Sequence, residues 1–260
     1  MFVLLSNDDG IEAPGLMALA KELAPKYEAV VVAPDRERSA SSHAITVHKP
    51  LRVRQINANL NIKQAYAVNG TPSDCVKLAL TTLLPKQPDM VISGINRGSN
   101  LGTDVFYSGT VAAALEGLLH GIPGIAVSLA TSSGDSDSDS DYSLAAQVAL
   151  LVVERLANKP NIPRMLININ VPDLPRDMIR GIRITRLGMR RYRNVFEIRR
   201  DPRGQTYYWL AGEPVAEVDE IDTDIAAIED GYISLTPITV DLTDYGAIKQ
   251  LQAWEKEFDI

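Results

Sequence analysis

The architecture of this chain is set by residues 2–34, which read FVLLSNDDGIEAPGLMALAKELAPKYEAVVVAP. Two short apolar runs within this segment, Phe2–Leu5 and Ala29–Val32, have the composition of buried strands. Between them, Pro14–Leu23 carries leucines and alanines at helical spacing. A strand, a helix and a second strand in this order predict two parallel strands joined by a crossover helix, which is the unit of an α/β fold.

The same alternation continues to about residue 170. Further buried strands are predicted at Met90–Ile92, Ile125–Val127 and Leu166–Ile169. Further helices are predicted at Asp74–Leu84, Thr110–His120 and Tyr142–Leu156. Residues 46–68 instead have short runs with a period of two, which we interpret as an inserted hairpin. The predicted fold class is therefore α/β, with a mostly parallel sheet covered by helices on both faces.

The composition and the periodicity of the sequence change beyond about residue 175. Residues 181–213 are rich in arginine and tyrosine, and DPRG at 201–204 followed by TYYWL at 206–210 indicates a long hairpin. A further strand is predicted at 233–240 and a closing helix at 245–258. Because a two-stranded ribbon is marginally stable alone, we expect it to pack against another subunit. We divide the chain into a core at 1–180 and a segment for oligomer contacts at 181–260.

The composition excludes several classes of protein. The chain has 260 residues, and 33 acidic against 26 basic side chains give a net charge of −7, which argues against wrapping a long nucleic acid. No apolar run reaches the ~18 residues needed to cross a membrane. Cys75 is the single cysteine, so a disulfide within the chain is excluded, which suits a reducing compartment. The start lacks a basic region, so we expect a cytoplasmic protein.

Polar clusters follow three of the predicted strands. The first is Ser6–Gly10, the second is Ala33–Ser39, and the third is Ser93–Asn100. Ligands bind outside the carboxyl ends of parallel strands, so the fold can bring these clusters together. Two carboxylates and two neutral oxygens stand out among them, namely Asp8, Asp9, Ser39 and Asn96. With no Cys or His at a metal-like spacing, this donor set favours a hard cation such as Mg²⁺, Mn²⁺ or Ca²⁺ over zinc.

A phosphate site is predicted beside this cation. Ser108, Gly109 and Thr110 open a predicted helix, where free backbone N–H groups and the helix dipole attract anions. A hard cation beside a phosphate suggests hydrolysis of a phosphate ester. Each motif also has an ordinary interpretation, since DDG can be a simple turn and Ser108 a simple helix cap. No dinucleotide, P-loop or α/β-hydrolase motif occurs in a strand-to-helix context.

Two further features each have two interpretations. His43, four residues after Ser39, is either a proton donor or a surface histidine. In the acidic run at 131–143, aspartates at alternate positions resemble a calcium loop. However, Ser140 stands where that loop needs glycine and Ala146 where it needs a bidentate glutamate. We therefore interpret the run, with Asp135, Asp137 and Asp139, as a solvated surface loop.

Long segments of the chain resemble the SurE family (survival protein E, a 5′/3′-nucleotidase). They are SNDDGIEAPG at 6–15, APDRERSASS at 33–42, NGTPSDCV at 69–76, SGINRGSNLGTDVFYSGTVAAALEG at 93–117 and ININVPDLP at 167–175. The resemblance implies a Rossmann-like core and a metal-dependent phosphatase acting on nucleoside monophosphates, with short polyphosphate as a further substrate of some members. It also implies a homodimer or homotetramer built partly by exchange of C-terminal elements.

The resemblance also assigns residues. It implies that Asp8, Asp9, Ser39 and Asn96 bind one divalent metal per subunit, and that the phosphate and its water are held by Asn7, Asn100, Ser108, Gly109 and Thr110. Some relatives have a histidine shortly after the VDLT motif, where this chain has Tyr245, so any role of that histidine is not carried over.

Asp9 is our first choice to orient or deprotonate the attacking water. The competing hypotheses are an aspartyl-phosphate route through Asp8, a nucleotide-binding module without turnover, and a nucleotide-sugar transferase that uses the paired aspartates to hold a metal.

Overall fold

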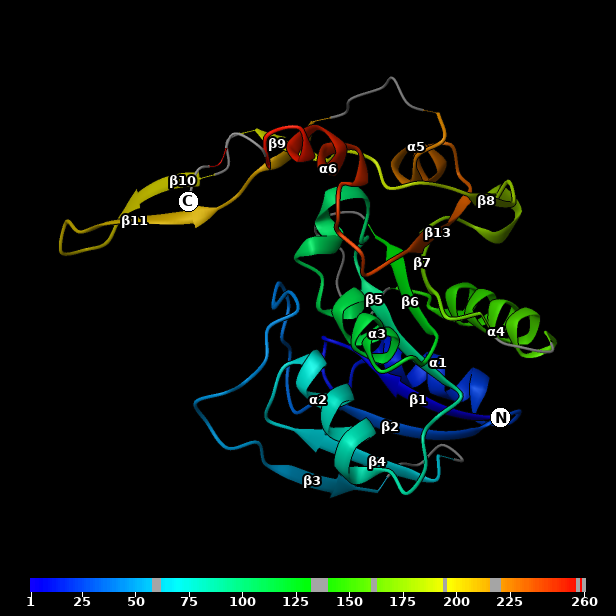
Figure 1. Ribbon diagram of the computed structural model, residues 1–260. Coiled ribbons are helices and arrows are strands. Elements are labelled where there is room, and N and C mark those ends of the chain that lie inside the picture. The colour runs from blue at the N-terminus through cyan, green and yellow to red at the C-terminus, as the bar shows by residue number, and fades with distance from the viewer. Residues whose placement is uncertain are drawn as a thin grey trace.

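Nine strands form one mixed sheet in the computed structural model, which describes residues 1–57, 62–131, 140–159, 163–193, 196–215, 221–255 and 258 (Figure 1). The sheet order is β3-β4-β2-β1-β5-β6-β7-β13-β8. These strands are β1 (Phe2–Ser6), β2 (Glu28–Pro34), β3 (Val53–Ile56), β4 (Gln64–Val68), β5 (Met90–Arg97), β6 (Gly124–Ala130), β7 (Leu166–Pro172), β8 (Ile182–Ile184) and β13 (Ile233–Ile238). No helix in these ranges is long and apolar enough to cross a membrane.

The six strands from β4 to β7 are all parallel to one another. Numbered along the chain, these six strands lie in the order 3-2-1-4-5-6, which is the doubly wound order of the Rossmann fold. The direction in which successive strands are added reverses between β1 and β5, so the ligand-binding crevice is expected at their carboxyl ends. The predicted fold class is confirmed.

The hairpin predicted at 46–68 exists, but it is not an insertion. β3 and β4 pair antiparallel, while β4 also pairs parallel with β2 from Val30 opposite Gln64 to Pro34 opposite Val68. β4 is therefore a strand of the core sheet, and the chain crosses from β2 to β4 through a loop and β3 instead of a helix. The period of two arises because β4 lies near the sheet edge, where alternate side chains are only half-buried.

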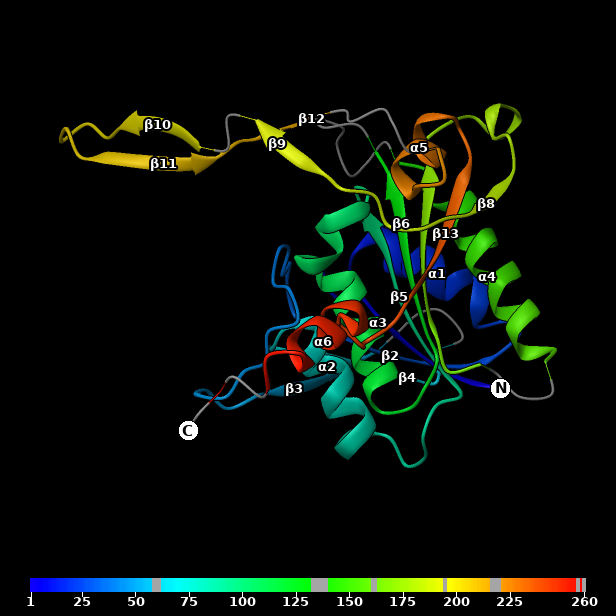
Figure 2. The same cartoon turned by 45° about the horizontal axis from the view of Figure 1, so that its top comes forward.

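Helices cover both faces of the sheet (Figures 1 and 2). On one face, α1 (Pro14–Leu23) and α4 (Ser143–Ala157) pack on a core that includes Val3 and Leu5. On the other, α2 (Pro72–Leu78) packs on a core that includes Phe2 and Leu4. α3 (Gly109–Leu119) packs beside α2, against β5 and β6. Successive β1 side chains thus enter opposite cores, as the period of a strand requires.

The helix predicted at 74–84 begins earlier and changes form. Pro72 starts α2, Thr71 and Asp74 form a capping box, and a π-helical turn at Ala79–Leu83 follows. The other short helices are 3₁₀ turns at Gly102–Phe106 and Arg176–Met178, and α5 (Asp224–Glu229). Cys75 is buried in the α2 core, as expected from its place on the apolar face.

The chain beyond residue 180 has two parts. β13 pairs antiparallel with β7 and β8 pairs parallel with β13, so both extend the core sheet. The predicted long hairpin is formed by β10 (Phe196–Arg200) and β11 (Thr206–Leu210), preceded by a short pair of β9 (Arg191–Arg193) and β12 (Glu213–Val215). We call residues 191–215 the arm, which projects from the body in Figures 1 and 2. The predicted boundary at residue 180 stays a prediction.

A buried carboxylate ties the segment that leads into the arm, around Gly188, to the body. Asp224, at the start of α5, accepts hydrogen bonds from the backbone N–H groups of Gly102 (2.8 Å) and Gly188 (2.9 Å). Gly102 has a φ of +53°, and a Cβ atom there would lie 2.6 Å from the Gly188 carbonyl oxygen. The segment leading to the arm therefore lies directly against the loop between β5 and α3.

The last helix, α6 (Tyr245–Gln252), begins at Tyr245, with Asp244 as its cap. Residues 132–139, with Asp135, Asp137 and Asp139, lie outside the described residues.

Candidate active site at the carboxyl ends of β1 and β5

The turn after β1 presents two carboxylates at the crevice. Asn7 closes this turn, because its Nδ2 donates to the Gly10 carbonyl (2.9 Å) and its Oδ1 accepts from the Gly10 N–H (3.3 Å). Gly10 has a φ of +108°, and a Cβ atom there would lie 3.1 Å from the Arg36 carbonyl carbon. A left-handed conformation and a close neighbour both require glycine at this position. The DDG motif is thus a tight turn that also displays Asp8 and Asp9.

Asp8 lies against the first turn of α3. Its side chain is 4% exposed, and its carboxylate accepts a hydrogen bond from the Thr110 hydroxyl. A Cβ atom on Gly109 would lie 2.8 Å from Asp8 Cβ and 2.9 Å from Asp8 Oδ2. The Ser108 hydroxyl caps α3 by accepting from the Val111 N–H at 3.1 Å. The structure therefore brings Asp8 together with the predicted phosphate site at Ser108–Thr110, which we call the phosphate seat.

The burial of Asp8 has an electrostatic consequence. Burial raises the pKa of the Asp8 carboxyl, and the hydrogen bonds from Thr110 oppose that rise. A buried carboxylate is costly unless a positive charge or several donors compensate it. Next to it, the Ser41 hydroxyl is buried and has no hydrogen-bond partner among the described residues. An anionic oxygen and an unpartnered hydroxyl at one place fit a cation bound by oxygen ligands.

Asp9 and Ser39 line one polar cavity of about 270 Å³, together with Glu37, Arg97 and Tyr142. Asp9 Oδ2 accepts from the Arg97 backbone N–H at 3.4 Å, which ties the end of β1 to the end of β5. The Ser39 hydroxyl donates to Glu37 Oε1 at 2.7 Å. These two predicted ligands therefore face the same space from two different loops.

Asn96 is the last predicted ligand, near the end of β5. Its Nδ2 donates to the Gly98 carbonyl at 2.8 Å, which leaves the amide oxygen as the atom able to bind a cation. Within the described ranges, no three His, Cys, Asp or Glu side chains gather as a metal site. The four predicted ligands include only two carboxylates, so this result agrees with a site completed by neutral oxygens.

Asn100 occupies a buried polar network rather than the open cavity. Its Nδ2 donates to the Ser128 hydroxyl (2.8 Å), and its backbone N–H donates to Asn170 Oδ1 (2.8 Å). The backbone carbonyl oxygen of Asn100 accepts hydrogen bonds from the side-chain Nδ2 atoms of Asn168 (2.8 Å) and Asn170 (3.0 Å). Sequence reasoning missed Ser128, Asn168 and Asn170, although polar residues inside the apolar strand LININVP were an available signal.

His43 has a definite partner. Its Nε2 lies 2.7 Å from the Oε2 of Glu116, a 2% exposed residue on α3. Neither interpretation of His43, as a proton donor or as an ordinary surface histidine, included this hydrogen bond. Glu116 and Ser41 were also absent from the predicted site, because an acid in an alanine-rich helix and a serine in a serine-rich loop carry no motif.

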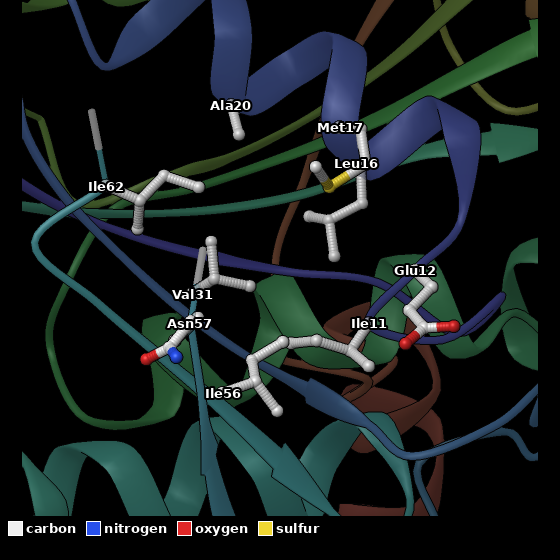
Figure 3. Close-up of a pocket in the computed structure, with 10 residues that line it drawn as sticks. Ile11, Glu12, Leu16, Met17, Ala20, Val31, Ile56, Asn57 and Ile62 are labelled. Carbon is white, nitrogen blue, oxygen red and sulfur yellow. The ribbon is translucent and has the colours of Figure 1, made fainter. Parts of the chain in front are cut away.

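A second cavity lies on the α1 face of the sheet (Figure 3). It has a volume of about 190 Å³ and is lined mainly by aliphatic side chains, including Ile11, Leu16, Val31 and Ile56, with Glu12 at its edge. Its lining includes none of the predicted site residues and no cationic side chain. It therefore does not offer the groups that bind a dianion.

Residues 3–194 match the family model described as Survival protein SurE. The chain belongs to the SurE family. It is 52% identical over 255 residues to the 5′-nucleotidase SurE of Heliobacterium modesticaldum, covering 98% of this chain and 92% of that protein. It is also 52% identical over 257 residues to the 5′-nucleotidase SurE of Synechococcus sp. (strain JA-3-3Ab), covering 98% and 97%.

The SurE fold is shared as well. The crystal structure of the SurE protein from Aquifex aeolicus superposes with a TM-score of 0.82 at 40% identity, covering 98% of this chain and 100% of that one. The resemblance predicted from the motifs is confirmed over nearly the whole chain. The likeness includes the arm and α6, since the matched length extends well beyond residue 194.

Proposed function

We propose that this SurE-family protein is a metal-dependent phosphatase that hydrolyses nucleoside monophosphates, acting as a 5′-nucleotidase. The observation that carries the proposal is the buried Asp8 carboxylate against the first turn of α3, with Asp9 beside it in an open polar cavity. The similarity to relatives named 5′-nucleotidase SurE supports the same activity. 3′-Nucleotides and short polyphosphate are further proposed substrates.

One divalent cation per subunit is proposed to be held by Asp8, Asp9, Ser39 and Asn96. The buried Asp8 carboxylate, whose pKa stays raised despite the hydrogen bonds from Thr110, and the unpartnered Ser41 hydroxyl support a cation here. The all-oxygen donor set favours Mg²⁺ or Mn²⁺, with Ca²⁺ as the third choice. When bound, such a cation polarises a phosphate oxygen and lowers the pKa of a water molecule.

The protein groups divide the remaining work. Asp9 faces the cavity and accepts the proton of the attacking water. The N–H groups of Ser108, Gly109 and Thr110 stabilise negative charge on the phosphate oxygens, because the start of α3 concentrates free donors there. Asn7 and Asn100 stay in the proposed phosphate-binding set, and their hydrogen bonds add a second task, which is to hold the two loops in place.

The test is release of inorganic phosphate from AMP and GMP with Mn²⁺ or Mg²⁺. We expect turnover that EDTA abolishes and fresh metal restores. Binding of nucleotide without phosphate release would instead indicate the binding module, and transfer of a sugar from a nucleotide-sugar would indicate the transferase. A trapped phosphoenzyme on Asp8 would replace direct attack by water.

A homodimer or homotetramer is the proposed assembly. Large apolar side chains on the hairpin of the arm are exposed, including Phe196 (61%), Trp209 (58%) and Leu210 (73%). On and just after α6, Leu251 and Trp254 are also about half exposed. Large apolar side chains that are exposed in the single chain are candidates for burial between subunits. Light scattering tests the assembly, and a cytoplasmic location, which the single Cys75 favours, is tested by cell fractionation.

A further inference from the structure

The loop that carries Ser39 has an unfavourable backbone conformation. Ala40 and Ser42 both have a φ of +53°, in the left-handed region that residues with a side chain rarely adopt. Such conformations persist only where the surroundings hold them, and they concentrate at functional sites. Residues 38–46, which we call the Ser39 loop, therefore need contacts that hold this conformation.

Both ends and the middle of the Ser39 loop are attached to different parts of the body. At its start, the Arg38 N–H donates to the Asp8 carbonyl at 2.7 Å. In its middle, the Ser42 hydroxyl donates to the Phe106 carbonyl at 2.6 Å. At its end, the Thr46 N–H donates to Asp74 Oδ1 at 2.8 Å. These contacts are to main-chain atoms or to a helix cap.

His43 supplies the side-chain contact of the loop with α3. Its Nε2 lies 2.7 Å from Glu116 Oε2, and Lys77 of α2 binds the other oxygen of the same carboxylate at 3.0 Å. Burial acts to raise the pKa of Glu116, but the hydrogen bonds from His43 and Lys77 outweigh it and hold that pKa below its ordinary value. The carboxylate is therefore ionised and binds both partners firmly.

The position of Glu116 connects this hydrogen bond to the candidate active site. Glu116 follows Thr110 by six residues on α3, so it lies less than two helical turns from the turn that contacts Asp8. His43 therefore joins the loop bearing Ser39 to the helix that bears the phosphate seat. Ser41 lies between them, and a Cβ atom on Gly109 would be 2.9 Å from Ser41 Oγ.

We propose that His43 is a positioning residue, which holds Ser39 and Ser41 against Asp8 and the start of α3 through its hydrogen bond to Glu116, and so sets the affinity of the site for its divalent cation. This inference deepens the proposed phosphatase site and rests on it. Groups that orient a metal ligand from behind typically change metal affinity 10- to 100-fold when they are removed.

Three variants of the full-length protein separate this role from a general effect on stability. His43→Ala removes the contact, and His43→Gln keeps an N–H donor for Glu116. Lys77→Met is the matched control, because it removes the nearer of the two basic groups beside the other Glu116 oxygen, Lys77 at 3.0 Å and the His120 ring at 3.5 Å, without changing the Ser39 loop. Each variant is titrated with Mn²⁺ alone, and free Mn²⁺ is followed by its paramagnetic resonance signal. Thermal unfolding in EDTA reports whether each variant is folded.

We expect His43→Ala to raise the Kd for Mn²⁺ by about 10-fold or more, the lower end of the range above. His43→Gln should recover most of the affinity, and Lys77→Met should match the wild type. At saturating Mn²⁺, His43→Ala should recover a large part of the wild-type kcat, because the change acts on cation binding.

An unchanged Kd in folded His43→Ala would overturn the positioning role. An equal loss of affinity in Lys77→Met would also overturn it, because the effect would then come from Glu116 and not from the loop. The proposed function is judged separately, on phosphate release by the wild type. If the wild type binds Mn²⁺ but releases no phosphate from AMP, that function fails, while the Mn²⁺ titrations still decide the role of His43.

Discussion

Gly109→Ala gives the sharpest test of how closely α3 approaches Asp8. The added Cβ atom would lie 2.8 Å from Asp8 Cβ, 2.9 Å from Asp8 Oδ2 and 2.9 Å from Ser41 Oγ, whereas ordinary contact begins at 3.4 Å. The three atoms must therefore move by about 0.5 Å or more, or the first turn of α3 must retreat by the same amount. Forcing extra atoms into a packed site typically costs about 1–3 kcal/mol.

The displacement falls on the groups proposed to hold the cation and the phosphate. A misplacement of about 1 Å at a reacting centre can reduce the rate 100-fold, so a shift of half that size should lower kcat/KM by about 10-fold or more. The assay is phosphate release from AMP with saturating Mn²⁺, combined with a Mn²⁺ titration. Both the rate and the metal affinity should fall.

Gly117→Ala is the matched control on the same helix. Its Cβ atom would lie 2.6 Å from Val91 Cγ2, so it crowds the contact of α3 with β5 but touches none of the proposed site residues. We expect it to lower the unfolding temperature while the kcat/KM of the folded protein stays near the wild-type value. Wild-type kinetics and Mn²⁺ affinity in Gly109→Ala would refute the placement of Asp8 and α3 as parts of one site.

Three further predictions follow from the buried charges and the arm. Asp8→Asn removes a buried charge, so it should abolish most of the turnover yet stabilise the protein without metal. In EDTA we expect the unfolding temperature to rise by about 2–4 °C, the shift that ~1 kcal/mol produces in a chain of this size. An unfolding temperature at or below the wild-type value would contradict the electrostatic account. Because its partners hold the pKa of Glu116 below the ordinary 4.5, the stability that this carboxylate contributes is present above that pH and is lost as the pH falls through its folded pKa. Glu116→Gln should therefore lower the urea midpoint at pH 7 and flatten its fall toward acid pH, and parallel curves for the two proteins would argue against the ion pair. Replacing Trp209 and Leu210 with serine should shift the assembly toward smaller species in light scattering while the body stays folded by circular dichroism, because both side chains are exposed in the single chain.

The fold was predictable because its central strands, such as β1 and β2, are buried on both faces. Runs such as Phe2–Leu5 and Leu166–Ile169 are continuous apolar segments. Several segments between such runs have apolar residues at helical spacing, which indicates crossover helices. β4 was harder to assign, because a half-buried strand near an edge alternates just as a hairpin does. Its parallel pairing with β2 depends on a contact across more than thirty residues, which a local pattern does not contain.

The candidate site was predictable where the chemistry depends on residue type, and less so where it depends on contacts. Asp8, Gly109 and Thr110 come together as expected, because strand ends and a helix start converge in this topology. The support for these residues was missed. Glu116 and Asn170 are recognised only when their partners, His43 and Asn100, are seen across the tertiary structure.

The Asp224 carboxylate divides the C-terminal region into a part that can vary and a part that cannot. Deleting the segment around Gly188 would leave a buried anion with one fewer of its three main-chain donors, Gly102, Gly188 and Ile225. Of these, Gly102 belongs to the segment that precedes the predicted phosphate site at the start of α3. No described residue of the hairpin formed by β10 and β11 is a buried charge of this kind. Changes beyond Arg193 should therefore act on the proposed subunit assembly and leave the body folded, whereas cuts nearer the body would displace the start of α3.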